Sequence, residues 1–392
     1  MKRTCEICGG KKIKKIYRQK FVTFSESELF SGYDVVVCKK CGFLFASNLP
    51  SPKDLEKFYK KNEKYAYKAD SGSMPEYAIT LHNTSFEFID TYLKNKFSNK
   101  RFNLAILDVG CGSGYLLHCL KKKGYKNIQG LDPAPDCRIV AKKLYGVKVV
   151  SATLSEYKNK NKFDLVMLAS VLEHMNRLDG VFKKILSLLQ KDGLLFLSVP
   201  NGERFGTKLK EPFLEFSLEH INYFTRASLR NLLHKYGFRN KAFETRSIKT
   251  FDSYPLDSLW EAGHDKTLTI KKDTLGEERM LKYLVSSKDL LNKVQKQINI
   301  LVKTQEQVVV WGVGSLTSRL LATTNLRAAN ISAFVDSNES VQGQLINRIK
   351  IASPDILKNK KMAVLVSTYI HGKAIKKVLL DRYKYKGKII LL

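Results

Sequence analysis

The chain contains 392 residues, more than one hydrophobic core usually holds and enough for two or three domains. Its hydrophobic content of 44% and aromatic content of 10% exclude a disordered chain and indicate globular domains. The net charge of +31 is compatible with a nucleic-acid or anionic-membrane partner. Because the basic residues are spread along the whole chain, we interpret them mainly as solvated surface that helps to hold phosphate-bearing small substrates.

No targeting or membrane-spanning segment is predicted. The first five residues, Met-Lys-Arg-Thr-Cys, are not followed by the apolar stretch of a secretory signal. No apolar run approaches the length of a membrane span. We therefore expect a cytoplasmic protein in which the seven cysteines stay reduced.

Two Cys-x-x-Cys-Gly pairs stand near the N-terminus, Cys5 with Cys8 and Cys38 with Cys41. Four thiolates suit tetrahedral Zn²⁺, since each short pair lets two sulfurs face one ion, and the following glycine permits a tight turn. Disulfides are the alternative, and a cytoplasmic location disfavours them. The segment has little core of its own, so bound metal would supply its folding energy. The sequence therefore predicts a structural zinc site with these four cysteines as ligands.

A break at Pro50-Ser51-Pro52 opens a helix-rich lead-in that extends to residue 105. The apolar spacing from Thr84 to Leu93 predicts an amphipathic helix. Several tyrosines of the lead-in could close over a cofactor or simply pack, and we favour packing. They are Tyr59, Tyr65, Tyr67 and Tyr77.

A glycine turn dominates the next segment. Residues 106–117 read Ile-Leu-Asp-Val-Gly-Cys-Gly-Ser-Gly-Tyr-Leu-Leu, which predicts a strand, a tight turn and the start of a helix. Glycine is needed there because the backbone must adopt positive φ and let a ligand come close. A second apolar run over residues 127–131 ends in Asp132, whose carboxylate can bind both hydroxyls of a ribose. Further strands over residues 163–168 and 193–199 complete an α/β alternation.

The rest of the chain predicts a helix capped by Thr225 and ended by Gly237, then loops or short strands over residues 246–275. Residues 276–305 predict a long amphipathic helix that bridges two domains. Its expected apolar face consists of Leu281, Leu284, Val285, Leu291, Val294, Ile298 and Leu301. A second glycine turn, Gly312-Val313-Gly314, then opens a smaller βαβ unit. This turn is either a nucleotide-phosphate cradle or a structural remnant, and the sequence leaves both open.

The run Asp-Val-Gly-Cys-Gly-Ser-Gly, the distal Asp132, and Phe-Asp-Leu-Val-Met-Leu with Glu173-His174 behind it resemble class I S-adenosylmethionine-dependent methyltransferases. NAD-dependent enzymes share the nucleotide-binding logic, but this turn is acidic at its start and lacks the dinucleotide spacing. The resemblance implies S-adenosyl-L-methionine as cofactor, with Asp108 and Gly110 along its methionine part and Asp132 on its ribose. The implied cofactor-binding set is Asp108, Gly110, Gly112, Asp132, Pro133, Ala152, Thr153, Leu168 and Ala169, with Ala152 and Thr153 near the adenine.

The three-part order of the chain, together with Glu219-His220-x-x-Tyr223-Phe224, resembles the zinc-containing C-methyltransferases of nucleotide-linked keto-sugars. That resemblance implies His220 as the catalytic base, Glu219 as the residue that orients it or binds a sugar hydroxyl, and His174 beside the substrate near the sulfonium. Imidazole suits a base because its unperturbed pKa is about 6.5. The family often has a tyrosine two residues before the glutamate. Here Ser217 stands there, which leaves oxyanion stabilisation without an assigned residue.

We therefore expect an α/β protein with a small four-cysteine zinc module, a central Rossmann-like methyltransferase domain and a smaller Rossmann-like C-terminal domain. The expected segments are 1–72 (zinc module and lead-in), 73–245 (methyltransferase domain), 246–305 (connector) and 306–392 (C-terminal domain). The predicted activity is C-methylation of a nucleotide-linked keto-sugar. The alternatives are O- or N-methylation of another small metabolite, and methylation of RNA, although a nucleic-acid partner is not favoured. The sequence does not predict an oligomeric state.

Overall fold

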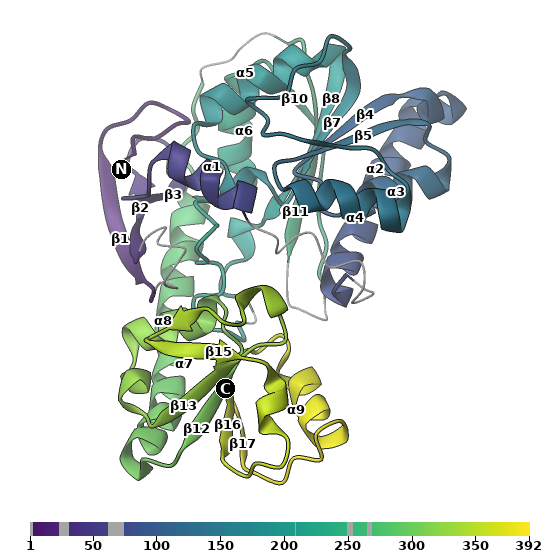
Figure 1. Ribbon diagram of the computed structural model, residues 1–392. Helices are drawn as coiled ribbons and strands as arrows, with labels where there is room; N and C mark the ends of the chain where they lie inside the picture. The colour runs from purple at the N-terminus through teal and green to yellow at the C-terminus, as the bar shows by residue number, and fades with distance from the viewer. Residues whose placement is uncertain (1–2, 23–30, 62–73, 208, 249–253, 265–268) are drawn as a thin grey trace.

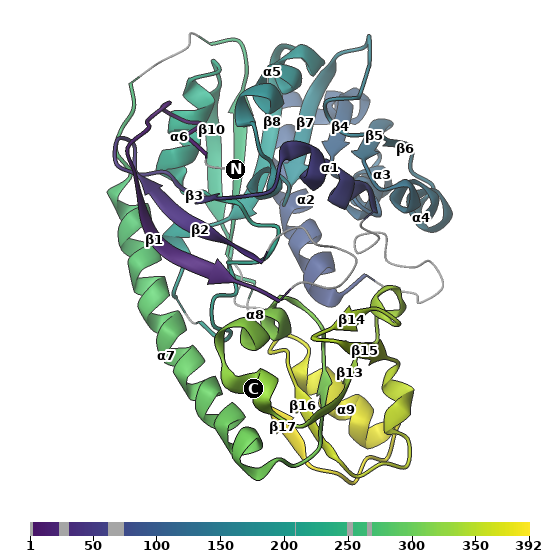
Figure 2. The same ribbon diagram turned by 60° about the vertical axis from the view of Figure 1, so that its left-hand side comes forward.

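The computed structural model describes residues 3–22, 31–61, 74–207, 209–248, 254–264 and 269–392 (Figure 1). These residues form an N-terminal sheet, a central sheet and a C-terminal sheet. A long helix leads from the first two to the third (Figure 2). Tyr65 and Tyr67, which the sequence offered as packing or cofactor-closing residues, lie outside the described residues, as does the expected boundary at residue 72.

The N-terminal sheet is antiparallel and has the strand order β1-β2-β3-β9. Its strands are β1 (Ile13–Lys20), β2 (Gly32–Cys38), β3 (Leu44–Ser47) and β9 (Asn222–Tyr223). Strand β9 comes from the central segment, since Leu44 pairs with Tyr223 and Phe45 with Asn222. The buried Arg3 guanidinium also donates to the Asn222 Oδ1 atom at 3.0 Å. The cysteine-bearing segment therefore shares a sheet with the chain that immediately follows Glu219 and His220.

The central sheet has the order β10-β11-β8-β7-β4-β5-β6 and is parallel except for β11. Its strands are β4 (Ala105–Val109), β5 (Asn127–Asp132), β6 (Val149–Ser151), β7 (Phe163–Ala169), β8 (Leu189–Pro200), β10 (Arg239–Thr245) and β11 (Pro255–Glu261). The helices before and between them are α1 (Pro52–Lys61), α2 (Glu76–Phe97), α3 (Tyr115–Lys123), α4 (Pro135–Tyr145), α5 (Leu178–Leu188) and α6 (Arg226–His234). The strands and helices that the glycine-turn segment predicted are confirmed.

Helices cover both faces of the central sheet, because alternate side chains of a strand point to opposite faces. In β7, Val166 and Leu168 pack in the core that α5 and α6 cover. Leu165 and Met167 pack in the core that α2 and α3 cover. This burial on both faces explains the continuous apolar runs in the strand sequences.

The central sheet extends beyond the expected boundary at residue 245. Strand β11 pairs antiparallel with both β8 and β10, and its Trp260 is fully buried. The sequence assigned this stretch to a connector of loops or short strands, because its local pattern is weak. Pairing with strands far away in the sequence, rather than local periodicity, makes it part of the sheet.

Helix α7 (Thr274–Thr304) is the predicted bridging helix, and Figure 2 shows it running past the N-terminal sheet to the C-terminal sheet. Its expected apolar face was wrong at two positions, because Leu281 is 42% and Val285 62% exposed. Met280 and Tyr283 are buried instead, in an aromatic cluster that includes side chains of the N-terminal sheet. The second half of the helix packs on the C-terminal sheet. The first half of the helix therefore buries one set of side chains against the N-terminal sheet, and the second half buries another set against the C-terminal sheet. A single periodic pattern along the whole helix cannot predict both sets.

The C-terminal sheet has the order β14-β15-β13-β12-β16-β17. Its strands are β12 (Val308–Trp311), β13 (Ile331–Val335), β14 (Leu345–Ile346), β15 (Ile349–Ala352), β16 (Ala363–Val366) and β17 (Ile389–Leu391). Helix α8 (Ser315–Thr323) packs in the core on one face, with α7, and α9 (Gly372–Asp381) packs on the other. The described residues also include the short 3₁₀ helices η2 (Ser98–Asn103), η3 (Leu172–His174), η4 (Gly202–Arg204), η5 (Asn325–Ala328), η6 (Glu339–Val341) and η7 (Pro354–Leu357). Among the described residues, no helix has the length and apolar character needed to cross a bilayer.

The cap of α6 provides a test of this packing. The Thr225 Oγ1 atom accepts a hydrogen bond from the Ser228 N–H at 3.0 Å and donates one to the buried Asp273 carboxylate at 2.5 Å. We predict that Thr225→Val lowers the free energy of unfolding by about 1–2 kcal/mol, because a helix N–H and a buried carboxylate each lose a partner. Urea unfolding measures the change. Ser187→Ala, at an exposed helix end, should change stability by less than about 0.5 kcal/mol; equal effects of both substitutions would contradict the capping role.

Candidate active site

The glycine turn lies at the carboxyl end of β4, between that strand and α3. Gly110 has φ +71°, and a Cβ atom there would lie 2.6 Å from the Val171 Cγ2 atom. Gly114 has φ +80°, and its Cβ would lie 2.8 Å from the Val147 Cγ2 atom. Both positions exclude a side chain on two grounds, backbone conformation and space. The tight glycine turn that the sequence predicted is confirmed.

Asp132 ties the end of β5 to this turn. Its Oδ2 atom accepts a hydrogen bond from the Gly112 N–H at 2.9 Å, and its Oδ1 atom accepts one from the Ala134 N–H at 3.0 Å. Burial raises the pKa of the carboxyl group, and the two N–H groups oppose that shift. The carboxylate is thus fixed at the edge of the sheet where ligands of open α/β folds bind.

Asp108 is the penultimate residue of β4, near Asp132, and is only 2% exposed. Burial and the nearby Asp132 raise the pKa of Asp108 to about 8. Its Oδ1 atom has no hydrogen-bond partner among the described residues. A buried carboxyl group with an unused acceptor favours a ligand that brings a hydrogen-bond donor or a positive charge.

The other predicted cofactor-binding residues lie at the carboxyl ends of neighbouring strands. Pro133 follows β5, and the Ala152 N–H donates to the Asp132 carbonyl at 3.1 Å. Thr153 donates its hydroxyl to the exposed Glu156 carboxylate. The Leu168 side chain is fully buried in the core, so only its backbone can face a ligand, and Ala169 ends β7.

A cluster of histidines and glutamates lies at η3, the segment that directly follows Val171, the neighbour of Gly110. The His174 and His220 rings lie 5.0 Å apart, and the His174 Nδ1 atom is 3.0 Å from the Glu219 carbonyl oxygen. The structure therefore brings together the three residues that the sequence proposed for catalysis. The Ile221 N–H donates to the Glu173 carbonyl at 2.9 Å, which joins the loop before β9 to η3.

Glu173 and Tyr59 complete this cluster, although the sequence gave neither a role there. Glu173 is 1% exposed, and burial raises its pKa to about 8. One of its oxygens lies 3.8 Å from the His174 Nε2 atom. The Tyr59 ring lies 6.2 Å from that of His174. The position of Glu173 next to His174 was a usable signal, whereas nothing in the sequence singled out Tyr59 from the other tyrosines.

Ligand atoms of Glu173, His174 and His220 lie within 4.8 Å of one another, so this set could also hold a cation. Ser217, which stands where the keto-sugar enzymes often have a tyrosine, has a local structural role. Its Oγ atom accepts hydrogen bonds from the backbone N–H groups of Glu219, at 3.2 Å, and His220, at 3.0 Å. The serine therefore closes the turn that presents both residues.

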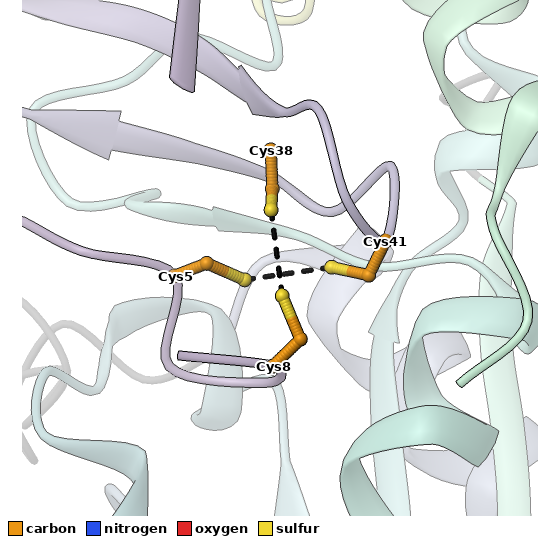
Figure 3. Close-up of side chains that lie close together, drawn as sticks. All are labelled: Cys5, Cys8, Cys38 and Cys41. Atoms are coloured by element: carbon orange, nitrogen blue, oxygen red, sulfur yellow. Dashed lines mark hydrogen bonds between the residues drawn. The ribbon is translucent and has the colours of Figure 1, made fainter. Parts of the chain in front are cut away.

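The four N-terminal cysteines form a compact cluster (Figure 3). The Sγ atoms of Cys5 and Cys41 are 3.4 Å apart, those of Cys8 and Cys38 are 3.5 Å apart, and all four lie within 4.8 Å of one another. A tetrahedral zinc site with Zn–S bonds of about 2.3 Å requires sulfurs about 3.8 Å apart. The donor set and its spacing therefore fit zinc.

The second glycine turn repeats part of the first. The Val313 N–H donates to the Asp336 carboxylate at 2.8 Å, as the Gly112 N–H does to Asp132. Gly312 has φ +102°. In both sheets, therefore, a carboxylate just after or at the end of one strand accepts a hydrogen bond from a backbone N–H of the glycine turn.

Comparison with known proteins agrees with this geometry. Residues 77–242 match a family described as "Methyltransferase domain", and residues 304–391 match one described as "C2185-like, N-terminal". The mitochondrial ubiquinone biosynthesis O-methyltransferase of Saccharomyces cerevisiae is 32% identical over 137 residues, which cover 33% of this chain and 42% of that protein. The ubiquinone biosynthesis O-methyltransferase of Glaesserella parasuis is 31% identical over 121 residues, covering 28% and 50%. The 1,6-didemethyltoxoflavin-N1-methyltransferase structure from Burkholderia thailandensis is 16% identical, with a TM-score of 0.43, and covers 57% of this chain and 97% of that one.

The doubly wound sheet with its acidic glycine turn is thus the class I S-adenosylmethionine-dependent methyltransferase fold. More particularly, residues 77–242 form a methyltransferase domain, as the sequence predicted. The chain spans about half the length of these two curated relatives, 42% and 50%. The comparison therefore assigns the central domain, and leaves the reaction of the whole protein to be proposed.

The Asp132 contacts give a test of the cofactor site. We predict that Asp132→Asn weakens S-adenosylmethionine binding at least about tenfold, because the new amide cannot accept from both N–H groups and still bind a ribose. Isothermal titration calorimetry measures the change. Asp136→Asn removes the same charge from the first turn of α4 and should alter affinity less than about twofold. Equal affinity of the Asp132 variant and the native protein would exclude Asp132 from the site.

Proposed function

We propose that this chain is an S-adenosylmethionine-dependent methyltransferase that transfers a methyl group to a carbon atom of a nucleotide-linked keto-sugar. The observation that carries the proposal is the His174–His220 pair, since His174 lies on η3, directly after the Val171 side chain that packs against Gly110 of the glycine turn. Such a pair offers a base at the place where a methyl donor would bind.

The cofactor would be held by the strand ends. Asp108 and the glycine turn at Gly110 would line its methionine part, and Asp132 would bind its ribose. When bound, S-adenosylmethionine supplies a methyl group on a positively charged sulfur. Burial and, to a lesser degree, the nearby Asp132 raise the pKa of Asp108 to about 8, so a positively charged ligand beside these two carboxyl groups would be favoured.

Carbon beside a ketone becomes nucleophilic only after it loses a proton, so C-methylation requires a base at the substrate. We assign that role to His220. The His174 Nδ1 atom faces the Glu219 carbonyl oxygen at 3.0 Å, which favours the tautomer with the proton on Nδ1. The Nε2 atom of His174 then accepts, next to the buried Glu173 carboxyl group. At 3.8 Å the Glu173 oxygen lies beyond hydrogen-bond distance of that atom, so Glu173 would influence the histidine pair through its charge.

O-methylation of a small metabolite is the second candidate. Its support is that both curated relatives described above are O-methyltransferases of ubiquinone biosynthesis. An oxygen acceptor also requires a base but forms no carbanion. The two reactions therefore differ in whether a substrate C–H bond is broken.

The decisive experiment incubates the protein with S-adenosylmethionine and a panel of nucleotide-linked keto-sugars, followed by mass spectrometry of the intact sugar nucleotides. C-methylation predicts a product heavier by one methylene group, together with exchange of a substrate C–H in deuterated water. Methylation without that exchange would favour an oxygen acceptor. No methylated product from any keto-sugar would contradict the proposed substrate.

The base assignment leads to a second test. We predict that His220→Asn lowers turnover at least about 100-fold, because general-base catalysis contributes on that scale. Binding of S-adenosylmethionine should change less than about twofold, since the substitution leaves the glycine turn intact. His371→Asn, at an exposed position of the C-terminal domain, is the matched control and should keep full turnover. Native turnover by the His220 variant would remove the histidine from the mechanism.

The cysteine cluster is proposed to hold one structural Zn²⁺, in a cytoplasmic setting where thiols stay reduced. Four sulfur ligands leave no open coordination position, so the metal would stabilise the fold and take no part in the chemistry. A metal bound there would also stabilise the sheet that adjoins the candidate active site. Strand β2 ends at Cys38, and β3 pairs with β9 directly after His220.

Removal of one ligand tests this site. We predict that Cys38→Ser abolishes stoichiometric zinc in the purified protein and lowers its thermal midpoint, because metal binding supplies folding free energy. Elemental analysis and calorimetry measure both effects. Cys119→Ser, in α3, should keep the metal. If the native protein without zinc had the same thermal midpoint as the native protein with zinc, the assignment would be contradicted.

A further inference from the structure

A buried arginine joins the C-terminal domain to the loop that carries Glu219 and His220. Arg319 lies on α8, and its side chain is 0% exposed. Its guanidinium donates to two backbone carbonyls of the central segment, Pro212 at 2.9 Å and Phe216 at 2.6 Å. It thus brackets residues 212–216 from a helix about a hundred positions further along the chain.

This burial is unusual for a cation. Taking a guanidinium out of water costs several kcal/mol, and a single carboxylate in good geometry is the common compensation. Here the nearest carboxylate described, that of Glu211, lies 3.8 Å away. The planar fork of arginine matches the two carbonyl acceptors instead. The side chain therefore acts chiefly as a clamp on backbone carbonyl groups.

The backbone of residues 212–216, which Arg319 contacts, has an unfavourable conformation at one position. Phe213 has φ +56°, a left-handed conformation that is unfavourable for a residue other than glycine. Its N–H donates to the Ser287 Oγ atom at 3.2 Å, and the Glu215 N–H donates to the Tyr283 hydroxyl at 2.8 Å, both on α7. Helix α7 thus satisfies the N–H groups of the bend while Arg319 satisfies the carbonyls.

The bend leads directly into the catalytic loop. Phe216 is followed by Ser217, whose Oγ atom accepts from the N–H groups of Glu219 and His220. The Ser217 carbonyl accepts from the Tyr33 hydroxyl at 2.8 Å. His220 thus lies four residues after Phe216, whose carbonyl Arg319 holds, and three residues after Ser217, whose carbonyl Tyr33 holds.

The N-terminal segment is bound to the same helix. The Ser318 hydroxyl donates to the Val22 carbonyl, and the Val22 N–H donates to the Ser318 carbonyl at 3.1 Å. The Arg319 guanidinium also lies 5.6 Å from the centre of the Phe21 ring. One turn of α8 thus contacts both residues 212–216, which precede the loop with Glu219 and His220, and the N-terminal segment at Phe21 and Val22.

We propose that Arg319 is a positioning residue for the catalytic loop, so that the C-terminal domain forms part of the active centre. This inference rests on the proposed function for the role of His220, but the clamp itself does not. It implies that loss of the clamp displaces Glu219 and His220 while the cofactor turn, to which the Arg319 hydrogen bonds do not reach, keeps its structure.

The test compares Arg319→Met, Arg319→Lys and a matched control, Arg327→Met, which removes an exposed arginine just after α8. In the full-length protein, amide hydrogen exchange of residues 217–221 should rise at least about tenfold in Arg319→Met. Exchange of residues 106–117 and the affinity for S-adenosylmethionine should change less than about twofold. Arg319→Lys should restore part of the protection, because one ammonium can still donate to a carbonyl.

An imidazole resonance of His220 provides a signature that loss of stability alone would not produce. It should shift in Arg319→Met and return toward its native position in Arg319→Lys, with His371 unchanged. Where the acceptor has been identified, kcat should fall about 10–100-fold in Arg319→Met. Unchanged exchange at residues 217–221, or an equal rise at residues 106–117, would overturn the proposal. Hydrogen exchange and the His220 resonance can be measured without an acceptor, so they test the proposal even if the keto-sugar panel gives no product.

Discussion

The structure depends on one hydrogen-bonded junction, the contact between the Asp132 carboxylate and the N–H of Gly112. It joins the end of β5 to the turn after β4 and fixes the turn in a conformation that only glycine adopts easily. Every other part of the candidate site is arranged around this edge of the sheet. Val171, which fills the space beside Gly110, is followed at once by the segment that contains Glu173 and His174.

The three expected domains prove to be closely joined. The cysteine-bearing segment completes its sheet with β9, a strand of the central segment, and α8 holds the backbone just before the loop that carries Glu219 and His220. Helix α7 contributes Tyr283 and Ser287 to the same bend. Residues 212–223 are therefore contacted by the cysteine-bearing segment, by α7 and by α8, which gives a physical reason for the four-cysteine segment and the C-terminal sheet to accompany a methyltransferase domain.

The sequence predicted what local pattern encodes. The strands β4, β5 and β7, the glycine conformations at 110 and 114 and the Thr225 cap all follow from neighbours along the chain, and the cysteine cluster follows from the matched spacing of its two pairs. It missed what depends on distant partners. The pairing of β3 with β9, the place of β11 in the central sheet and the exposure of Leu281 are set by packing. The clamp by Arg319 could not be predicted either, because an arginine in an amphipathic helix is usually at the surface.

The central claim is that the acidic glycine turn binds S-adenosylmethionine, and titration of that ligand into the intact native protein by calorimetry tests it most directly. The account predicts saturable binding of one ligand per chain, with a dissociation constant in the micromolar range. Absence of any binding heat up to millimolar ligand, in protein that melts cooperatively, would contradict it.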